Sequence, residues 1–306
     1  MALDPNFKDN LTLMGSQDRP RYLMPLLALL AVAIIAVVVY YAVVPFRPSA
    51  RTTATIQPAQ PNAGDQAAAG ILGAVKTMLA SNNFALARET CYELLQNAAG
   101  PETIGEAEEM LGRINIGLLL SPAPMPEKTE YVVQSGDTLE RLAKKNGTTV
   151  QLIQKCNSLR GKMIHPGDRL RIFHARLAIV VSKTKNNLLL TANDRFLKRY
   201  PVGTGKFGTT PAGTFVISDK IAEPPWWRPD GRMIPFGDKE NVLGTRWMSL
   251  IPTGETPKVR GYGIHGTWEP DTIGKQLSDG CIRMINTDVE ELFLIVPAGT
   301  PVTIAE

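Results

Sequence analysis

An almost wholly apolar segment at residues 22–44 places the strongest constraint on how this chain is organised. The segment is long enough to cross a hydrocarbon core of ~30 Å, and it exceeds the ~7–15-residue apolar core of a cleaved signal peptide. Arg19 and Arg21 precede it and Arg47 and Arg51 follow it, so the flanking positive charges are nearly balanced. Because the run is unbroken, we expect a transmembrane helix in preference to a buried core helix. Cleavage after the segment stays an open alternative.

The composition argues against several functional classes. The 306 residues leave room for about two domains, and the net charge is only +4 with no long run of Lys or Arg, so a nucleic-acid role has little support. The cysteines and histidines are widely spaced: Cys91, Cys156, Cys281, His165, His174 and His265. An odd number of separated cysteines argues against a disulfide framework, and the spacing predicts no metal site.

Residues 45–120 change from a linker to a helical pattern. Residues 45–66 are rich in Pro, Ala, Gln and Thr, which predicts a flexible linker. Residues 67–120 repeat apolar positions at three-four spacing in three runs, broken at Asn82-Asn83 and Gly100-Pro101, so we expect three short helices. The segment resembles a tetratricopeptide fragment. We favour a small spacer bundle over a docking surface, and a protein partner for it is unknown.

A second linker, the Pro-rich residues 121–129, leads into a short domain at residues 130–173. Tyr131 begins a strand-like run, turn signals stand at Ser135-Gly136-Asp137 and Pro166-Gly167-Asp168, and two short helical runs lie between the turns. This βααβ pattern resembles the LysM domain. The resemblance implies binding to N-acetylglucosamine-containing glycan, and therefore to the glycan strands of peptidoglycan.

Residues 176–306 are predicted to be mostly β. Short apolar or alternating runs, such as residues 177–181 and 213–218, are separated by turn residues. Thr287 to Glu290 has the form of a capping box, so we expect a short helix soon after Cys281.

Cys281 and His265 are the residues of this segment that suggest chemistry. Each stands beside glycine, in Gly263-Ile264-His265-Gly266 and in Gly280-Cys281. A free thiol has a pKa of roughly 8.5, and a neighbouring imidazolium holds it ionised. The imidazole then returns the proton to a leaving amine. Gly280 lets the backbone approach a carbonyl closely, so that N–H groups near Cys281 stabilise an oxyanion. The pattern predicts cysteine acyl transfer.

These residues lie in blocks that resemble the L,D-transpeptidases of bacterial peptidoglycan, the YkuD-type catalytic domain. The blocks occur in the family's order: residues 210–215, 224–227, 241–248, 265–267 and 278–284. The resemblance covers residues 176–306 and implies a β-sandwich with a short helix after the cysteine loop. It also implies a reaction that uses no metal or organic cofactor.

The resemblance assigns a role to each site residue. Cys281 is the nucleophile, His265 the general acid and base, Gly266 the residue whose backbone orients His265, and Gly280 the backbone at the oxyanion. The predicted substrate-binding residues are Arg283, Ser278, Thr267 and Trp247. A guanidinium two residues from the nucleophile suits a substrate carboxylate. Trp247, with Trp226 and Trp227, fits a core position as well as a loop over the cleft.

Asp279 departs from the family's pattern, in which His often precedes the Gly-Cys pair. A carboxylate facing Cys281 raises the thiol pKa and lowers the thiolate fraction. We therefore expect the Asp279 side chain to point away from the sulfur.

The combined expectation is a multidomain, membrane-anchored L,D-transpeptidase that joins peptidoglycan stem peptides. Such an enzyme must face the cell wall, which orients residues 1–21 to the cytoplasm and makes residues 22–44 a single-pass signal anchor in the cell membrane. The catalytic domain then faces the periplasm or the wall. Two alternatives stay open at this point: an L,D-carboxypeptidase that uses water as the acceptor, and a non-catalytic peptidoglycan-binding anchor.

Overall fold

The computed structural model describes residues 63–97 and 100–306. The transmembrane anchor expected at residues 22–44, the cytoplasmic residues 1–21 and nearly all of the first linker lie outside the described residues. Within the described part of the chain, no helix combines the length and the apolar character that crossing a bilayer requires.

Three helices occupy the segment that the periodicity predicts as helical. They are α2 (Ala63–Ala80), α3 (Phe84–Asn97) and α4 (Pro101–Leu119). Helix α2 begins four residues before the expected boundary at residue 67. The expected breaks are present, because Asn82 adopts a φ of 60° between α2 and α3 and Pro101 opens α4. Cys91 is fully buried in the shared core, as its place on the apolar face predicts.

The helical segment packs directly against the edge of the catalytic sheet instead of standing apart as a spacer. Tyr92 Oη donates to the Phe196 carbonyl at 2.7 Å, and Asn115 Nδ2 donates to the Leu197 carbonyl at 2.9 Å. Both carbonyls belong to β5 (Arg195–Pro201), the last strand of its sheet. An edge strand presents unpaired backbone groups, and here helix side chains satisfy them.

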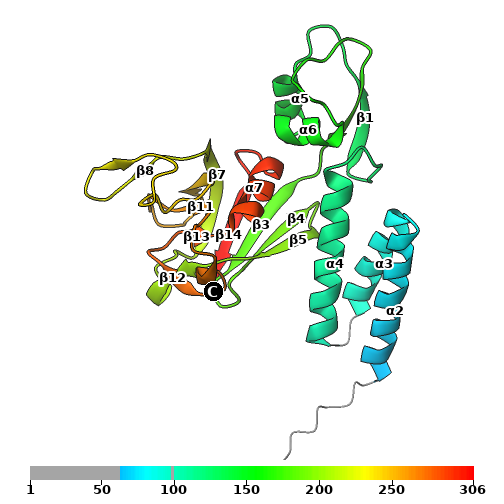
Figure 1. The fold of residues 1–306 in the computed structure, drawn as a ribbon, viewed down its shortest axis with the longest axis horizontal. Coiled ribbons are helices and arrows are strands. Elements are labelled where there is room, and N and C mark those ends of the chain that lie inside the picture. The colour runs from blue at the N-terminus through cyan, green and yellow to red at the C-terminus, as the bar shows by residue number, and fades with distance from the viewer. Residues whose placement is uncertain (1–62, 98–99) are drawn as a thin grey trace, which may run out of the picture. The chain divides into compact units, whose positions relative to one another are not determined.

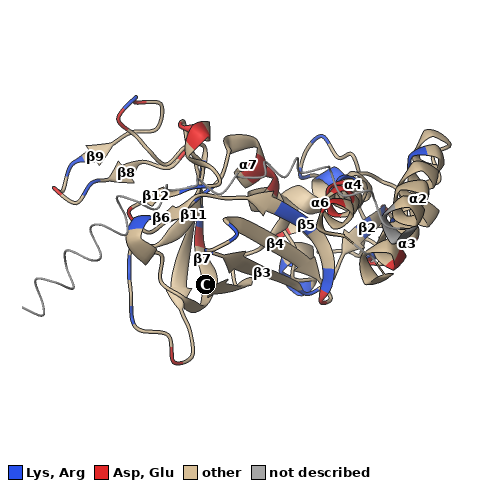
Figure 2. Ribbon diagram, turned by 90° about the horizontal axis from the view of Figure 1, so that it is seen from below, with Lys and Arg blue, Asp and Glu red and all other residues tan. Residues whose placement is uncertain are grey.

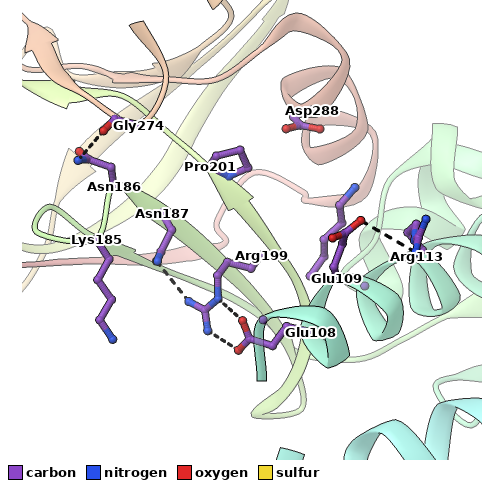
Figure 3. Close-up of a pocket in the computed structure, with 13 residues that line it drawn as sticks. Glu108, Glu109, Arg113, Lys185, Asn186, Asn187, Arg199, Pro201, Gly274 and Asp288 are labelled. Atoms are coloured by element: carbon purple, nitrogen blue, oxygen red, sulfur yellow. Dashed lines mark hydrogen bonds and ion pairs between the residues drawn. The ribbon is translucent and has the colours of Figure 1, made fainter. Parts of the chain in front are cut away.

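An ion pair fastens α4 to the same strand. Arg199 of β5 donates to both carboxylate oxygens of Glu108 at 2.6 and 2.7 Å, a bidentate arrangement that Figure 3 shows. The pair forms one wall of a cavity of about 600 Å³, which is also lined by Lys185 and Asp288. No residue of the candidate site described below lines this cavity.

The LysM-like domain has the expected βααβ order. Its elements are β1 (Lys128–Val132), α5 (Leu139–Lys145), α6 (Val150–Cys156) and β2 (Arg169–Phe173), and β1 pairs antiparallel with β2. Thr138 and Thr149 cap the two helices through their hydroxyls. Thr149 Oγ1 also donates to the Leu294 carbonyl, and the buried Cys156 thiol donates to the Leu119 carbonyl at 3.0 Å. These contacts join α6 to the catalytic domain and to α4.

The catalytic domain is built on one eight-stranded mixed sheet, in the order β13-β11-β10-β7-β14-β3-β4-β5. The strands not yet given are β3 (Leu177–Ser182), β4 (Asn187–Ala192), β7 (Gly213–Ala222), β10 (Arg246–Pro252), β11 (Gly263–His265), β13 (Ile282–Arg283) and β14 (Pro301–Ala305). The sequence predicts a sandwich, whereas the strands form one continuous hydrogen-bonded order that curls around a helix (Figure 1). The mostly β character is confirmed.

Two small ribbons flank the end of the sheet that holds β11 and β13. One pairs β6 (Thr204–Gly205) with β12 (Gln276–Ser278) in parallel, and the other pairs β8 (Trp226–Trp227) with β9 (Met233–Ile234) in antiparallel. In the view of Figure 1, β8 is drawn above β11 and β13, and β12 is drawn below them.

Helix α7 (Asn286–Ile295) fills the inside of the curl. Glu291 reaches β5, where it accepts from Lys198 Nζ at 2.6 Å and Tyr200 Oη at 2.8 Å. At the other end, Lys220 Nζ of β7 donates to the carbonyls of Phe293 and Val296 at 2.6 Å each. The predicted capping box does not form: the helix starts at Asn286, its N-cap is Ile285, and no side chain caps it.

Candidate active site

The pairing of β11 with β13 brings the predicted catalytic residues together. The two strands are parallel, with Ile264 opposite Ile282 and His265 opposite Arg283. Both isoleucines are buried in the core. Because side chains alternate along a strand, His265 and Arg283 share the opposite face, and Cys281 directly precedes β13. With a strand spacing of ~4.8 Å and a rise of ~3.3 Å per residue, extended backbone continued from Arg283 back to Cys281 would put the Cα atoms of Cys281 and His265 about 8 Å apart.

The His265 imidazole is buried and oriented. Its Nδ1 lies 2.6 Å from the Gly266 carbonyl oxygen, which requires the Nδ1–H tautomer and leaves Nε2 as the proton acceptor. The Trp247 ring stacks on the imidazole, with centroids 5.7 Å apart. His265 is 3% exposed, and this burial lowers its pKa to about 4, with a smaller lowering contribution from Arg283. The ring is therefore neutral at neutral pH.

The Cys281 thiol is half-buried and donates weakly to the Gly261 carbonyl, with Sγ 3.6 Å from the oxygen. Burial is the main cause that raises its pKa, and the positive charge of Arg283 opposes that rise. Within residues 63–97 and 100–306, no hydrogen bond joins Sγ to His265. The free site thus holds a thiol beside a neutral imidazole, in place of the preformed thiolate–imidazolium pair that the sequence suggests.

The loop before Cys281 is held by its own side chains. Ser278 Oγ accepts from the Gly280 N–H at 3.1 Å and donates to the Cys281 carbonyl at 2.6 Å. Ser278 is buried, so its hydroxyl shapes the loop. The Gly280 N–H is thereby engaged, which disfavours it as the predicted oxyanion donor. The N–H of Cys281 has no backbone partner in the described part of the chain and is the remaining donor.

Glycine is required at position 280. Its φ is +134°, and a Cβ there would lie 2.5 Å from the Tyr262 ring and 3.1 Å from the Thr209 carbonyl oxygen. Thr210 Oγ1 donates to the Gly280 carbonyl at 2.9 Å and fixes the same peptide from the other side.

Asp279 turns its carboxylate toward Lys206, and the carboxylate oxygen lies 2.8 Å from Lys206 Nζ. The side chain is 91% exposed, and Lys206 lowers the pKa of the carboxyl. Its negative charge is the smallest of the contributions to the raised pKa of Cys281. The replacement of the usual histidine therefore perturbs the thiol only weakly.

Arg283 provides a carboxylate-binding group beside the thiol. Its side chain is 18% exposed, and Nη1 lies 3.4 Å from Glu269 Oε2, a carboxylate that is itself exposed. Thr267, another predicted substrate-binding residue, is buried, and its Oγ1 accepts from the Glu269 N–H at 3.1 Å. Thr267 therefore anchors the segment that carries this carboxylate.

Asn286 is a site residue for which the sequence offers no local signal. Its Oδ1 accepts from the Thr245 N–H at 3.1 Å. A Cβ on Gly244 or on Gly266 would collide with the same oxygen. Asn286 thus joins the loop before β10 to the peptide whose carbonyl orients His265.

The three tryptophans singled out in the sequence occupy different positions. Trp247 is half-buried against His265, Trp226 is half-buried on β8, and Trp227 is 68% exposed on the same strand of the β8–β9 hairpin. The buried Asn241 pins the base of this hairpin, because its Nδ2 donates to the carbonyls of Pro224 and Ile234 at 2.9 and 3.2 Å. Figure 2 shows basic and acidic segments of both signs around β8 and β9.

Comparison with known proteins agrees with this fold and site. The L,D-transpeptidase catalytic domain family, YkuD, matches residues 176–304, and the LysM domain family matches residues 131–173. A putative L,D-transpeptidase YkuD of Bacillus licheniformis is 40% identical over 182 residues, which cover 57% of this chain and 97% of that protein. The protein of the same name in Bacillus subtilis is 38% identical over 185 residues, with the same two coverages.

A shorter match, to the putative L,D-transpeptidase YqjB of Bacillus subtilis, is 38% identical over 129 residues and covers 42% of this chain and 70% of that protein. The chain belongs to the YkuD-type L,D-transpeptidase family, and it carries a LysM domain in front of the catalytic domain. Both domains imply an association with peptidoglycan.

Proposed function

We propose that the protein is a peptidoglycan L,D-transpeptidase in which Cys281 takes an acyl group from a tetrapeptide stem. The observation that supports this most strongly is the pairing of His265 with Arg283 across β11 and β13, with Cys281 directly before β13 and His265 oriented by the Gly266 carbonyl. Membership of the family supports the general activity. The roles of the individual residues are our assignment.

The first half of the reaction forms a thioester. The Cys281 thiol passes its proton to Nε2 of His265 while the sulfur bonds to the carbonyl carbon that joins the third stem residue, a diamino acid, to the terminal D-alanine. The Cys281 N–H donates to the resulting oxyanion. The C–N bond then breaks, and the nitrogen of D-alanine leaves with the proton from His265. The Arg283 guanidinium binds a substrate carboxylate during these steps.

The second half transfers the acyl group to an amine. The amine of a second stem, or of a protein, attacks the thioester and gives a proton to His265, which returns it to the departing thiolate. The product is a new amide cross-link. Water in place of the amine would give L,D-carboxypeptidase activity, which the same nucleophile supports.

The remaining parts of the chain fit this role. The LysM domain holds the glycan strand from which the stem projects. Residues 22–44 anchor the protein in the cell membrane with the catalytic domain on the wall side. These two assignments rest on the LysM family match and on the sequence pattern.

Incubation of the purified protein with tetrapeptide muropeptides, followed by mass spectrometry, tests the proposal. Cross-linked dimers and released D-alanine support transpeptidation, trimmed monomers alone support the carboxypeptidase, and no product contradicts both. Cys281→Ala is the matched inactive control. A carbapenem adduct at Cys281 separates an active site from a non-catalytic anchor, because only a competent nucleophile is acylated.

A further inference from the structure

Phe207 lies in an unusual position at the tip of the loop that follows β6. Its side chain is 96% exposed, more than any other large apolar side chain in the described residues. Its backbone is left-handed, with φ 52° and ψ 28°, and Gly208 follows with φ 73°. Left-handed backbone is uncommon for bulky residues, and a turn of this form favours asparagine or glycine.

Neither the exposure nor the backbone of Phe207 contributes to stability. An exposed ring buries no apolar surface in the free protein, and the left-handed conformation disfavours a bulky residue. The loop is nevertheless fixed, because Thr209 donates to the Lys206 carbonyl through its N–H at 3.1 Å and through Oγ1 at 2.9 Å. A rigid turn that presents a strained residue is a feature of functional loops.

The loop is attached to the peptide that precedes the nucleophile. Thr210 Oγ1 accepts from the Gly205 N–H at 2.7 Å and donates to the Gly280 carbonyl at 2.9 Å. A Cβ on Gly205 would lie 2.9 Å from Gly280 Cα, so the two backbones are in contact. The ion pair of Lys206 with Asp279 is a second link, and it neutralises both charges.

A second exposed apolar residue lies on the neighbouring strand. Leu277 is 52% exposed on β12, between Gln276 and Ser278, which pair with Thr204 and Gly205 of β6. Figure 2 shows β6 and β12 beside β11. Phe207 and Leu277 are thus two exposed apolar residues on segments joined to the cysteine loop, and we call them the apolar rim.

The reach of the substrate indicates what contacts this rim. Phe207 is two residues from Gly205, whose backbone touches that of Gly280, so its Cα lies within about 7 Å of that contact and its ring extends further. In a tetrapeptide stem the scissile carbonyl belongs to the third residue, and three extended residues span about 10 Å. For a stem that runs from Cys281 toward this loop, the sugar that carries it therefore comes within reach of the Phe207 ring.

We propose that Phe207, supported by Leu277, contacts the N-acetylated sugar to which the donor stem is attached, and that this contact selects glycan-linked stems over free peptides. The proposal rests on the transpeptidase function proposed above. A neutral sugar fits this rim, because Lys206 is paired with Asp279 and Lys183, which lies near Gly208, is paired with Glu306.

The test compares two donors, a disaccharide-tetrapeptide and the free tetrapeptide, with the full chain and with Phe207→Asn. Asparagine tolerates the left-handed turn, so the variant keeps the loop. We expect kcat/KM for the disaccharide-tetrapeptide to fall about 5- to 10-fold, mainly through KM, while the value for the free peptide changes less than about 2-fold. Phe207→Tyr should retain the preference. The LysM domain is identical in all variants, so its contribution cancels in the comparison.

Leu86→Asn is the matched control, because Leu86 is 49% exposed on α3 and away from the cysteine loop. An equal fall on both donors, or no change on either, would overturn the sugar contact while leaving the transpeptidase function intact. A wild-type protein that converts neither donor would instead refute the proposed function, and the sugar contact with it.

Discussion

The protonation state of the catalytic pair gives the sharpest prediction. Burial lowers the pKa of His265 from 6.5 to about 4, so protonating the imidazole costs about 3 kcal/mol more than in water. At pH 7 only about one imidazole in a thousand carries a proton. Burial also raises the pKa of the Cys281 thiol above that of a free thiol, so the thiolate is the minor form at pH 7. We expect the free enzyme to contain a neutral thiol and a neutral imidazole.

Two measurements check this state. The ultraviolet absorbance of the thiolate, taken as the difference between wild type and Cys281→Ala, should be nearly absent at pH 7 and appear only in alkaline solution. Acylation by a carbapenem should be nearly constant from about pH 5 to 8 and fall below about pH 5 as His265 gains a proton and stops acting as the base. Cys91 and Cys156 are fully buried and should be silent in the native protein. Thiolate absorbance with an apparent pKa below 7 would refute the reasoning, because it would demonstrate a preformed ion pair.

Three further predictions follow from other contacts. Asn286→Ala should lower the acylation rate about tenfold, because it releases the Gly266 peptide. Asn286→Asp keeps the acceptor oxygen and should retain most of the rate, but its negative charge should raise the pKa of His265 and so shift the low-pH fall of the rate to higher pH. An unchanged pH–rate profile in both variants would exclude a positioning role. The pKa of His265 is lower in the folded than in the unfolded protein, so the unfolded state binds the extra proton and stability is lost as pH falls from about 6.5 to 4. This loss amounts to about 3 kcal/mol of unfolding free energy. It should be missing in His265→Gln when the free energies of urea unfolding at about pH 6.5 and pH 4 are compared. Glu108→Ala and Arg199→Ala should each destabilise the protein by about 1–2 kcal/mol, because the bidentate pair is partly buried. The double variant should lose less stability than the two single losses added together. Additive losses would show that the two charges are not coupled.

The local chemistry of the site could be predicted from the sequence, because the informative residues are short-range neighbours. Gly266 follows His265 directly, and its carbonyl lies where the expected orienting group should be. Gly280 precedes Cys281 as the close backbone contacts there require, although its N–H is bound to Ser278 and the predicted oxyanion role is disfavoured. Secondary structure in the helical and LysM segments also follows from periodicity and turn residues.

The tertiary contacts could not be predicted in the same way. Asn286 acts on Gly244 and Gly266, and no local pattern connects positions so far apart. Helix α4 contacts β5 through the Glu108–Arg199 ion pair, through hydrogen bonds from Asn115 to backbone carbonyls and through a shared apolar core, and the sequence does not indicate these partners. The interpretation of this segment as a spacer failed for that reason. A capping-box pattern at residues 287–290 was equally unreliable, because packing sets the start of α7 at Asn286.

The hydrogen bonds that Tyr92 and Asn115 donate to the outermost strand, β5, also bear on the behaviour of truncated forms of the enzyme. A fragment cut at the start of the catalytic domain would leave the carbonyls of β5 bare, ready to pair with the same strand of another copy. Self-association of such a fragment would then reflect the lost helices and not a natural oligomer. Proteins that begin at or before α2 keep the helices that cover β5.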